Sequence, residues 1–92
     1  MQTLSELRNG KLLGIKHLAL RENLTQFPTE ILSLADSLEI LDLSNNQLSS
    51  LPDEIAQLKK LKILFASNNQ FTTLPKALGQ CPNLEMIGFK SN

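Results

Sequence analysis

The chain has 92 residues, of which 41% are hydrophobic, and it contains neither Trp nor Tyr, so it fits one small domain with an aliphatic core. Nine basic residues balance nine acidic ones, which argues against nucleic acid or an anionic membrane as the main partner, because those partners select a basic surface. No segment approaches the roughly 20 apolar residues of a membrane-spanning helix, so no membrane association is expected.

The cysteine content and the first residues indicate a cytoplasmic protein. Cys81 is the single cysteine, whereas a secreted domain of this size usually depends on disulfide pairs. Glu6, Arg8 and Lys11 are charged where a signal peptide needs an apolar stretch.

Residues 1–14 predict a short N-terminal helical cap. Thr3-Leu4-Ser5-Glu6 is a capping-box pattern, and Asn9-Gly10 is typical of a helix end. Because the first repeat of a stacked array would otherwise expose its core, we expect the leucines of this segment to cover it. These leucines are Leu4, Leu7 and Leu12.

From residue 15 onward, one pattern recurs every 23 residues. Its first apolar position holds Ile15, Leu38, Leu61 and Leu84. Its second holds Leu18, Leu41, Leu64 and Ile87, and its third holds Leu20, Leu43, Ala66 and Phe89. This spacing, L-x-x-L-x-L-x-x-N, predicts four leucine-rich repeats in residues 15–92, beginning at 15, 38, 61 and 84. The fourth is incomplete at Asn92, so we expect the chain to be a piece of a longer protein.

The pattern predicts an α/β solenoid, with a parallel sheet on its concave face and short helices on its convex side. The alternation of apolar residues suits a short strand with one buried face. The strands should be parallel because the chain returns to the same end in each repeat. Each return limb carries an apolar–Pro pair, and Pro suits the first position of a helix. The expected helices span residues 28–34, 52–58 and 75–80.

An asparagine closes each repeat, and buried asparagine can satisfy backbone groups that leave the strand ladder. We therefore expect a structural ladder made of Asn23, Asn46, Asn69 and Asn92. The first repeat has one residue fewer between Leu20 and Phe27 than the second has between Leu43 and Leu51. Its turn should differ locally.

Residues 15–92 resemble the intracellular 23-residue leucine-rich-repeat class with an L-P-x-x-I-x-x-L limb, which includes Ras-suppressor-like scaffolds and many bacterial proteins. Residues 38–44, 64–75 and 78–82 further resemble the N-terminal repeats of bacterial leucine-rich-repeat protein kinases. That resemblance implies a kinase domain downstream. The chain itself has no Gly-rich loop, His-Arg-Asp loop or Asp-Phe-Gly motif, so it is not expected to be an enzyme.

The residues that could carry chemistry are isolated. His17 is the only histidine and has no metal ligands at a suitable spacing. Cys81 takes the place of a core leucine, so we expect it to be a small buried hydrophobe. Ser44 and Ser67 have no general base nearby in the pattern. No catalytic, metal or cofactor site is predicted.

The residues between the core positions should point outward and form the concave face in rows. The first row is His17, Ile40, Ile63 and Met86, the second is Ala19, Asp42, Phe65 and Gly88, and the third is Arg21, Ser44, Ser67 and Lys90. Neighbouring strands lie about 4.8 Å apart, so the apolar members of these rows should touch. We expect Ile40, Ile63, Phe65 and Met86 to bind a protein partner, with His17, Arg21, Asp42 and Lys90 around them.

Other interpretations stay open. Isoleucine is common in strands of any function, so Ile40 and Ile63 are also consistent with a face that binds nothing. The side chain of Phe65 could instead point into the core, where Ala66 leaves space. A regulatory or substrate-recruiting arm of a kinase and a purely structural spacer are the rival functions. Four strands span only roughly 15 Å, so we expect more repeats in the parent, weak binding, or self-association through the uncapped residues 84–92.

Overall fold

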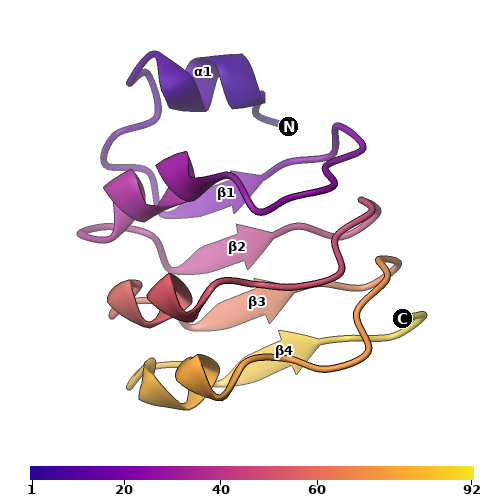
Figure 1. Ribbon diagram of the computed structural model, residues 1–92. Coiled ribbons are helices and arrows are strands. Elements are labelled where there is room, and N and C mark those ends of the chain that lie inside the picture. The colour runs from indigo at the N-terminus through magenta and orange to yellow at the C-terminus, as the bar shows by residue number, and fades with distance from the viewer.

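The computed structural model describes all 92 residues and contains one parallel sheet flanked by short helices (Figure 1). The strands β1 (His17–Ala19), β2 (Ile40–Asp42), β3 (Ile63–Phe65) and β4 (Met86–Gly88) lie in the order β1-β2-β3-β4. Each strand pairs in parallel with the next, so that His17, Ile40, Ile63 and Met86 are aligned across the sheet. The predicted solenoid with a parallel sheet is confirmed.

The core lies between the sheet and the return limbs. The middle residues of the first three strands, Leu18, Leu41 and Leu64, are completely buried. They belong to one hydrophobic cluster of 21 buried residues that runs from the cap through the first three repeats, and the partly buried Leu84 and Phe89 of the fourth repeat pack against it. The first three strands therefore bury every second side chain, as the alternation predicts, and leave the others on the opposite face.

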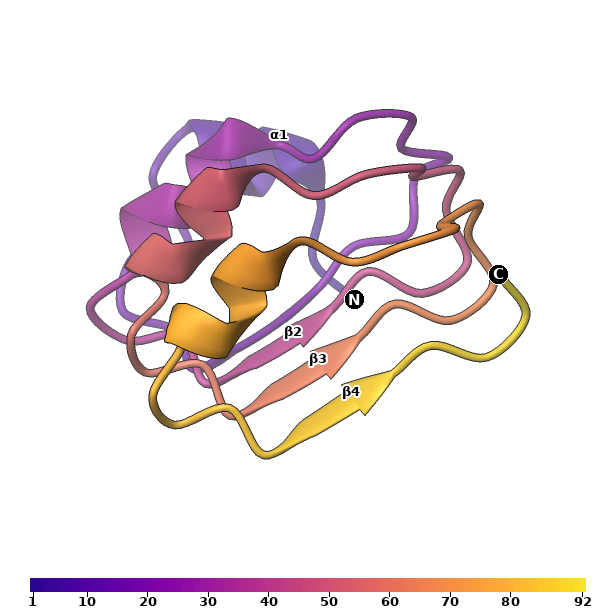
Figure 2. The same cartoon turned by 60° about the horizontal axis from the view of Figure 1, so that its bottom comes forward.

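Each return limb contains a short 3-10 helix, on the side of the sheet that faces the core (Figure 2). These helices are η1 (Thr29–Leu34), η2 (Asp53–Gln57) and η3 (Lys76–Gln80). The prediction that they start at proline was wrong by one residue. Pro28 and Pro52 keep extended backbones, with ψ of 112° and 155°, and the carbonyl of Pro28 accepts the 3.0 Å hydrogen bond from Ile31 that starts η1.

The N-terminal segment covers the edge of the first repeat. Helix α1 (Leu4–Arg8) begins with the predicted capping box between Thr3 and Glu6, and it buries Leu7. Gln2 runs beside β1: its backbone N–H donates to the carbonyl of Ala19 (3.2 Å), and its side-chain oxygen accepts from the Ala19 N–H (2.9 Å). The Gln2 side chain also donates to the carbonyl of His17 at 3.0 Å. Outward-facing backbone groups of this edge strand are thereby satisfied.

Candidate functional site

The candidate site is the open face of the sheet, which we define as the face turned away from the 3-10 helices. It carries the first and third residues of each strand: His17, Ala19, Ile40, Asp42, Ile63, Phe65, Met86 and Gly88. Strand geometry puts these side chains on the face opposite the buried middle leucines. No segment of the chain forms a second layer over this face (Figure 2).

An apolar row crosses three strands of the open face. The sheet register pairs Ile40 with Ile63, and Ile63 with Met86. Ile40 and Ile63 are half-buried, whereas Met86 is 46% exposed. Paired residues on neighbouring strands have Cβ atoms about 5 Å apart, close enough for their side chains to touch.

Phe65 lies on the open face beside this row. A Cβ built on Gly88 would come within 3.2 Å of the Cδ1 atom of Phe65, so the ring leans over the glycine of the next strand. The alternative in which Phe65 turns inward beside Ala66 is therefore wrong. The aromatic rings in the core are those of Phe27 and Phe71, and Phe71, which is 1% exposed, stacks on Phe89 with ring centroids 5.8 Å apart.

Polar side chains follow the strands on the same face. Asp42 accepts a 3.0 Å hydrogen bond from the backbone N–H of Ser44. Arg21, Asp42 and Ser44 surround one small hollow of about 50 Å³ at the β1–β2 end. Arg21 and Lys90 are exposed, and neither belongs to the two salt bridges of the structure, Arg8–Glu30 and Lys62–Glu39.

A row of charged residues just before the strands was not predicted from the sequence. It consists of Lys16, Glu39, Lys62 and Glu85, which alternate in sign at the 23-residue interval. Lys62 and Glu39 form an ion pair at 3.5 Å. The same periodicity that defines the repeats is the signal that would have revealed this row.

Asparagine side chains link neighbouring repeats just after the carboxyl ends of the strands. The Asn46 amide donates to the carbonyls of Leu20 and Leu43, both at 2.9 Å, and its oxygen accepts from the N–H of Leu24 at 3.1 Å. The corresponding bonds join Asn69 to Leu43, Ala66 and Leu48, and Asn92 to Ala66, Phe89 and Phe71. Each side chain therefore satisfies backbone groups of its own repeat and of the preceding one.

Asn23 does not belong to this ladder, contrary to our expectation. It is exposed and has a φ of 55°, whereas the later repeats place positive φ at the residue before the ladder, as in Asn45 at 63° and Asn68 at 56°. The missing residue in the first turn moves the left-handed position onto Asn23. The unequal turn length was the signal for this departure.

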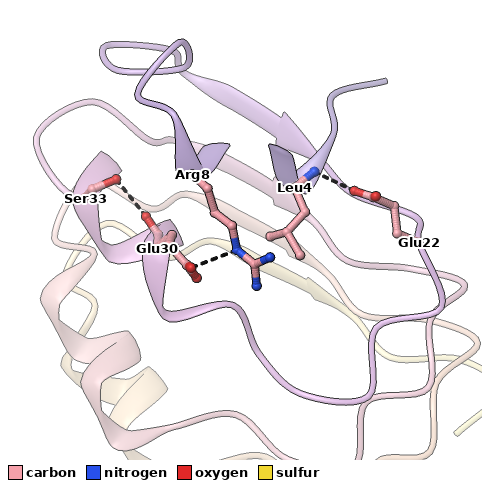
Figure 3. Close-up of polar contacts among 5 residues, drawn as sticks. All are labelled: Leu4, Arg8, Glu22, Glu30 and Ser33. Atoms are coloured by element: carbon pink, nitrogen blue, oxygen red, sulfur yellow. Dashed lines mark hydrogen bonds and ion pairs between the residues drawn. The ribbon is translucent and has the colours of Figure 1, made fainter. Parts of the chain in front are cut away.

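Polar contacts fasten the cap to the first repeat (Figure 3). Arg8 forms a 3.0 Å ion pair with Glu30, and the backbone N–H of Leu4 donates to the Glu22 carboxylate. The pKa of Glu30 is lowered, first by a hydrogen bond from its own backbone and then by Arg8. A polar cleft of about 430 Å³ lies between the cap and residues 22–30. These contacts join residues far apart in sequence, so no local pattern predicted them.

The other reactive side chains do not form a chemical site. Cys81 is buried, its thiol donates to the carbonyl of Ile55 at 3.5 Å, and burial raises its pKa, so its nucleophilic thiolate is disfavoured. No group of three or more His, Cys, Asp or Glu side chains is placed to hold a metal ion. None of the helices has the length and apolar character needed to cross a membrane.

Comparison with known proteins identifies the repeats. The family profile described as "Leucine-rich repeat region" matches residues 2–91. The chain belongs to the leucine-rich repeat family. A solved structure of a leucine-rich repeat protein from Leptospira interrogans has a TM-score of 0.79 and 39% sequence identity, and the match covers 90% of this chain and 21% of that chain.

Two kinases of Dictyostelium discoideum are also similar to this leucine-rich repeat chain. Probable serine/threonine-protein kinase roco5 is 47% identical over 51 residues, which are 54% of this chain and 2% of that protein. Probable serine/threonine-protein kinase qkgA is 41% identical over 39 residues, which are 42% of this chain and 2% of that protein. The resemblance to the repeats of protein kinases is confirmed, whereas a bacterial origin stays a prediction.

Proposed function

We propose that these repeats bind a protein partner through the open face of the sheet. The leucine-rich repeat fold supports a protein-interaction module. The observation that carries the proposal is the register that aligns Ile40, Ile63 and Met86 on neighbouring strands, with Phe65 beside them. A contiguous apolar area on a soluble protein is typical of a surface that another protein covers.

We assign the polar neighbours of this row to the rim of the interface. They are His17, Arg21, Asp42 and Lys90. Exposed rim charges influence orientation and association rate more than affinity.

We further propose that the chain consists of a cap of residues 1–14 and repeats that begin at 15, 38, 61 and 84. We also propose a cytoplasmic location for the protein.

The four strands supply only part of a standard interface. They span roughly 15 Å, and a stable complex usually buries about 800 Å² on each partner. This chain covers 21% of the related Leptospira protein. We therefore expect that further repeats extend the face, that binding by these residues alone is weak, or that the edge of β4 also takes part.

A second candidate function is the regulatory or substrate-recruiting arm of a protein kinase. The similarity to roco5 and qkgA favours it, because both are kinases. Sequencing the gene beyond the codon for Asn92 tests this candidate. A Gly-rich loop followed by His-Arg-Asp and Asp-Phe-Gly motifs would support it, and an ending without them would remove it.

Site-specific photocrosslinking tests the protein-binding proposal in the source cell. A photoreactive amino acid replaces Met86 on the open face in one variant, and Gln57 on helix η2 in the control. Both side chains are exposed, so both variants should fold. We expect a discrete crosslinked product from position 86 only. Equal labelling from both positions, or none from position 86, would favour a structural spacer.

A further inference from the structure

A polar hollow lies next to the apolar part of the open face. Its volume is about 50 Å³, and Arg21, Asp42 and Ser44 line it, with Ala19 beside them. The sheet register pairs Asp42 with Phe65 on the neighbouring strand. Paired residues have Cβ atoms about 5 Å apart, so a partner that covers Phe65 also reaches this hollow. The hollow has room for one small group of that partner.

The side chains of this hollow have hydrogen-bonding capacity that the chain itself does not use. One carboxylate oxygen of Asp42 accepts the N–H of Ser44 at 3.0 Å, and the other accepts no hydrogen bond within the chain. The Ser44 hydroxyl and the Arg21 guanidinium also have no partner within the chain. Solvent can satisfy these groups while the face is uncovered. A partner that excludes the solvent must supply hydrogen bonds in its place, because a buried polar group without a partner is costly.

The charges that border the hollow oppose each other. The Asp42 carboxylate attracts a cation and repels an anion, and the Arg21 guanidinium has the reverse preference. The two groups line the same hollow without forming an ion pair with each other. A charged group of a partner would gain from one of them and lose to the other, and it would also lose its own hydration on burial. The hollow therefore favours a neutral group that both donates and accepts hydrogen bonds.

On the basis of the proposed function, we infer that the partner places a carboxamide, the side chain of Asn or Gln, in this hollow. The amide NH₂ group donates to the unused carboxylate oxygen of Asp42, and the amide oxygen accepts from Arg21 or from the Ser44 hydroxyl. An amide carries its donor and its acceptor on two separate atoms, so it serves both sides of the hollow at once. The same partner segment places an apolar side chain on Phe65.

Asp42 is thereby the residue that determines specificity, and its replacement by asparagine should change the preference. In Asp42→Asn, the side-chain oxygen can still accept the N–H of Ser44, but the second oxygen is replaced by an NH₂ donor. A donor at this position suits a carboxylate of the partner better than an amide NH₂ group. The variant should therefore accept Asp or Glu where the wild type selects Asn or Gln.

Selection from a library of random linear peptides displayed on phage tests this inference. Peptides are selected on the whole chain and kept when Phe65→Ala abolishes their binding. We expect the retained peptides to be enriched in Asn and Gln relative to the unselected library. Changing that Asn to Asp, or that Gln to Glu, should weaken binding to the wild type at least ~10-fold, and it should be neutral or favourable on Asp42→Asn. The control Asp53→Asn, on helix η2, should discriminate as the wild type does.

The outcomes separate this inference from the proposed function. Peptides that need Phe65 but lack enrichment in Asn or Gln overturn the carboxamide and leave the open face as a binding surface. A change from amide to acid that affects binding to the wild type and to Asp42→Asn equally does the same. A selection without any Phe65-dependent peptide contradicts the proposed function itself. Asp53 is exposed, and a thermal melt of each variant verifies that it folds.

Discussion

The side-chain amide of Asn46 donates a 2.9 Å hydrogen bond to the carbonyl of Leu20, which lies in the preceding repeat. Its oxygen accepts the N–H groups of Glu22 and Leu24, both at 3.1 Å. Asn46 itself is only 7% exposed. Water therefore has little access to replace these bonds, and Asn46 helps to join the first two repeats alongside the pairing of β1 with β2.

We predict that Asn46→Ala lowers the free energy of unfolding by about 2 kcal/mol or more, because each buried backbone group left unpaired costs ~1–3 kcal/mol. Urea denaturation measures the difference. The matched control is Asn45→Gly, since Asn45 is exposed with φ of 63° and glycine tolerates that conformation. The control should change stability by less than about 0.5 kcal/mol. Equal losses in both variants would contradict the assigned role of Asn46.

Phe65 and Gly88 should be energetically coupled. We predict that Gly88→Ala destabilises the chain when Phe65 is present, because the new methyl group meets the ring at 3.2 Å. In a Phe65→Ala background the same change should be neutral or stabilising. A double-mutant cycle measured by chemical denaturation should give a coupling of about 1 kcal/mol. Strict additivity would mean that the ring does not rest on Gly88.

The attachment of the cap should weaken in acid. The pKa of Glu30 in the folded protein lies below its ordinary value, so its contribution to stability is present at neutral pH and is lost as the pH falls through that lowered pKa. We predict that Arg8→Met lowers Tm at pH 7 and that its difference from the wild type shrinks below about pH 4. Lys11→Met, which changes another exposed cap cation, is the control. A constant difference from pH 7 to pH 3 would exclude the ion pair as its cause.

The periodic features were accessible to sequence analysis because each repeat restates them. Leu18, Leu41 and Leu64 mark the buried face of each strand, and the rows on the other face follow from the same register. The exposed position of Asn23 was not predicted. The first turn has one residue fewer and its positive φ falls on Asn23, although the residue type at the expected ladder position is unchanged. Two contacts depend on the packing of side chains that are distant in sequence: the contact of the Phe65 ring with Gly88, and the ion pair between Arg8 and Glu30. Periodicity carries no information about either contact.

The outer edge of β4 differs from the other strands in the burial of its middle residue. Ile87 is 38% exposed, whereas the equivalent Leu18, Leu41 and Leu64 are completely buried. An edge strand with exposed apolar surface invites pairing with another chain.

We predict that the chain of residues 1–92 self-associates through this edge as its concentration rises, and that Ile87→Lys suppresses the association. Fully burying a side chain of this size is worth about 1.5–3 kcal/mol, and a buried lysine without a partner reverses that gain. The control Leu13→Lys adds the same charge at an exposed apolar residue near the cap, where Leu13 is 65% exposed, and should leave association unchanged. Sedimentation velocity over a range of concentrations measures both variants. A wild-type chain that stays monomeric throughout would show that β4 is not the contact. Equal effects of the two substitutions would show the same, because Ile87 lies on β4 and Leu13 does not.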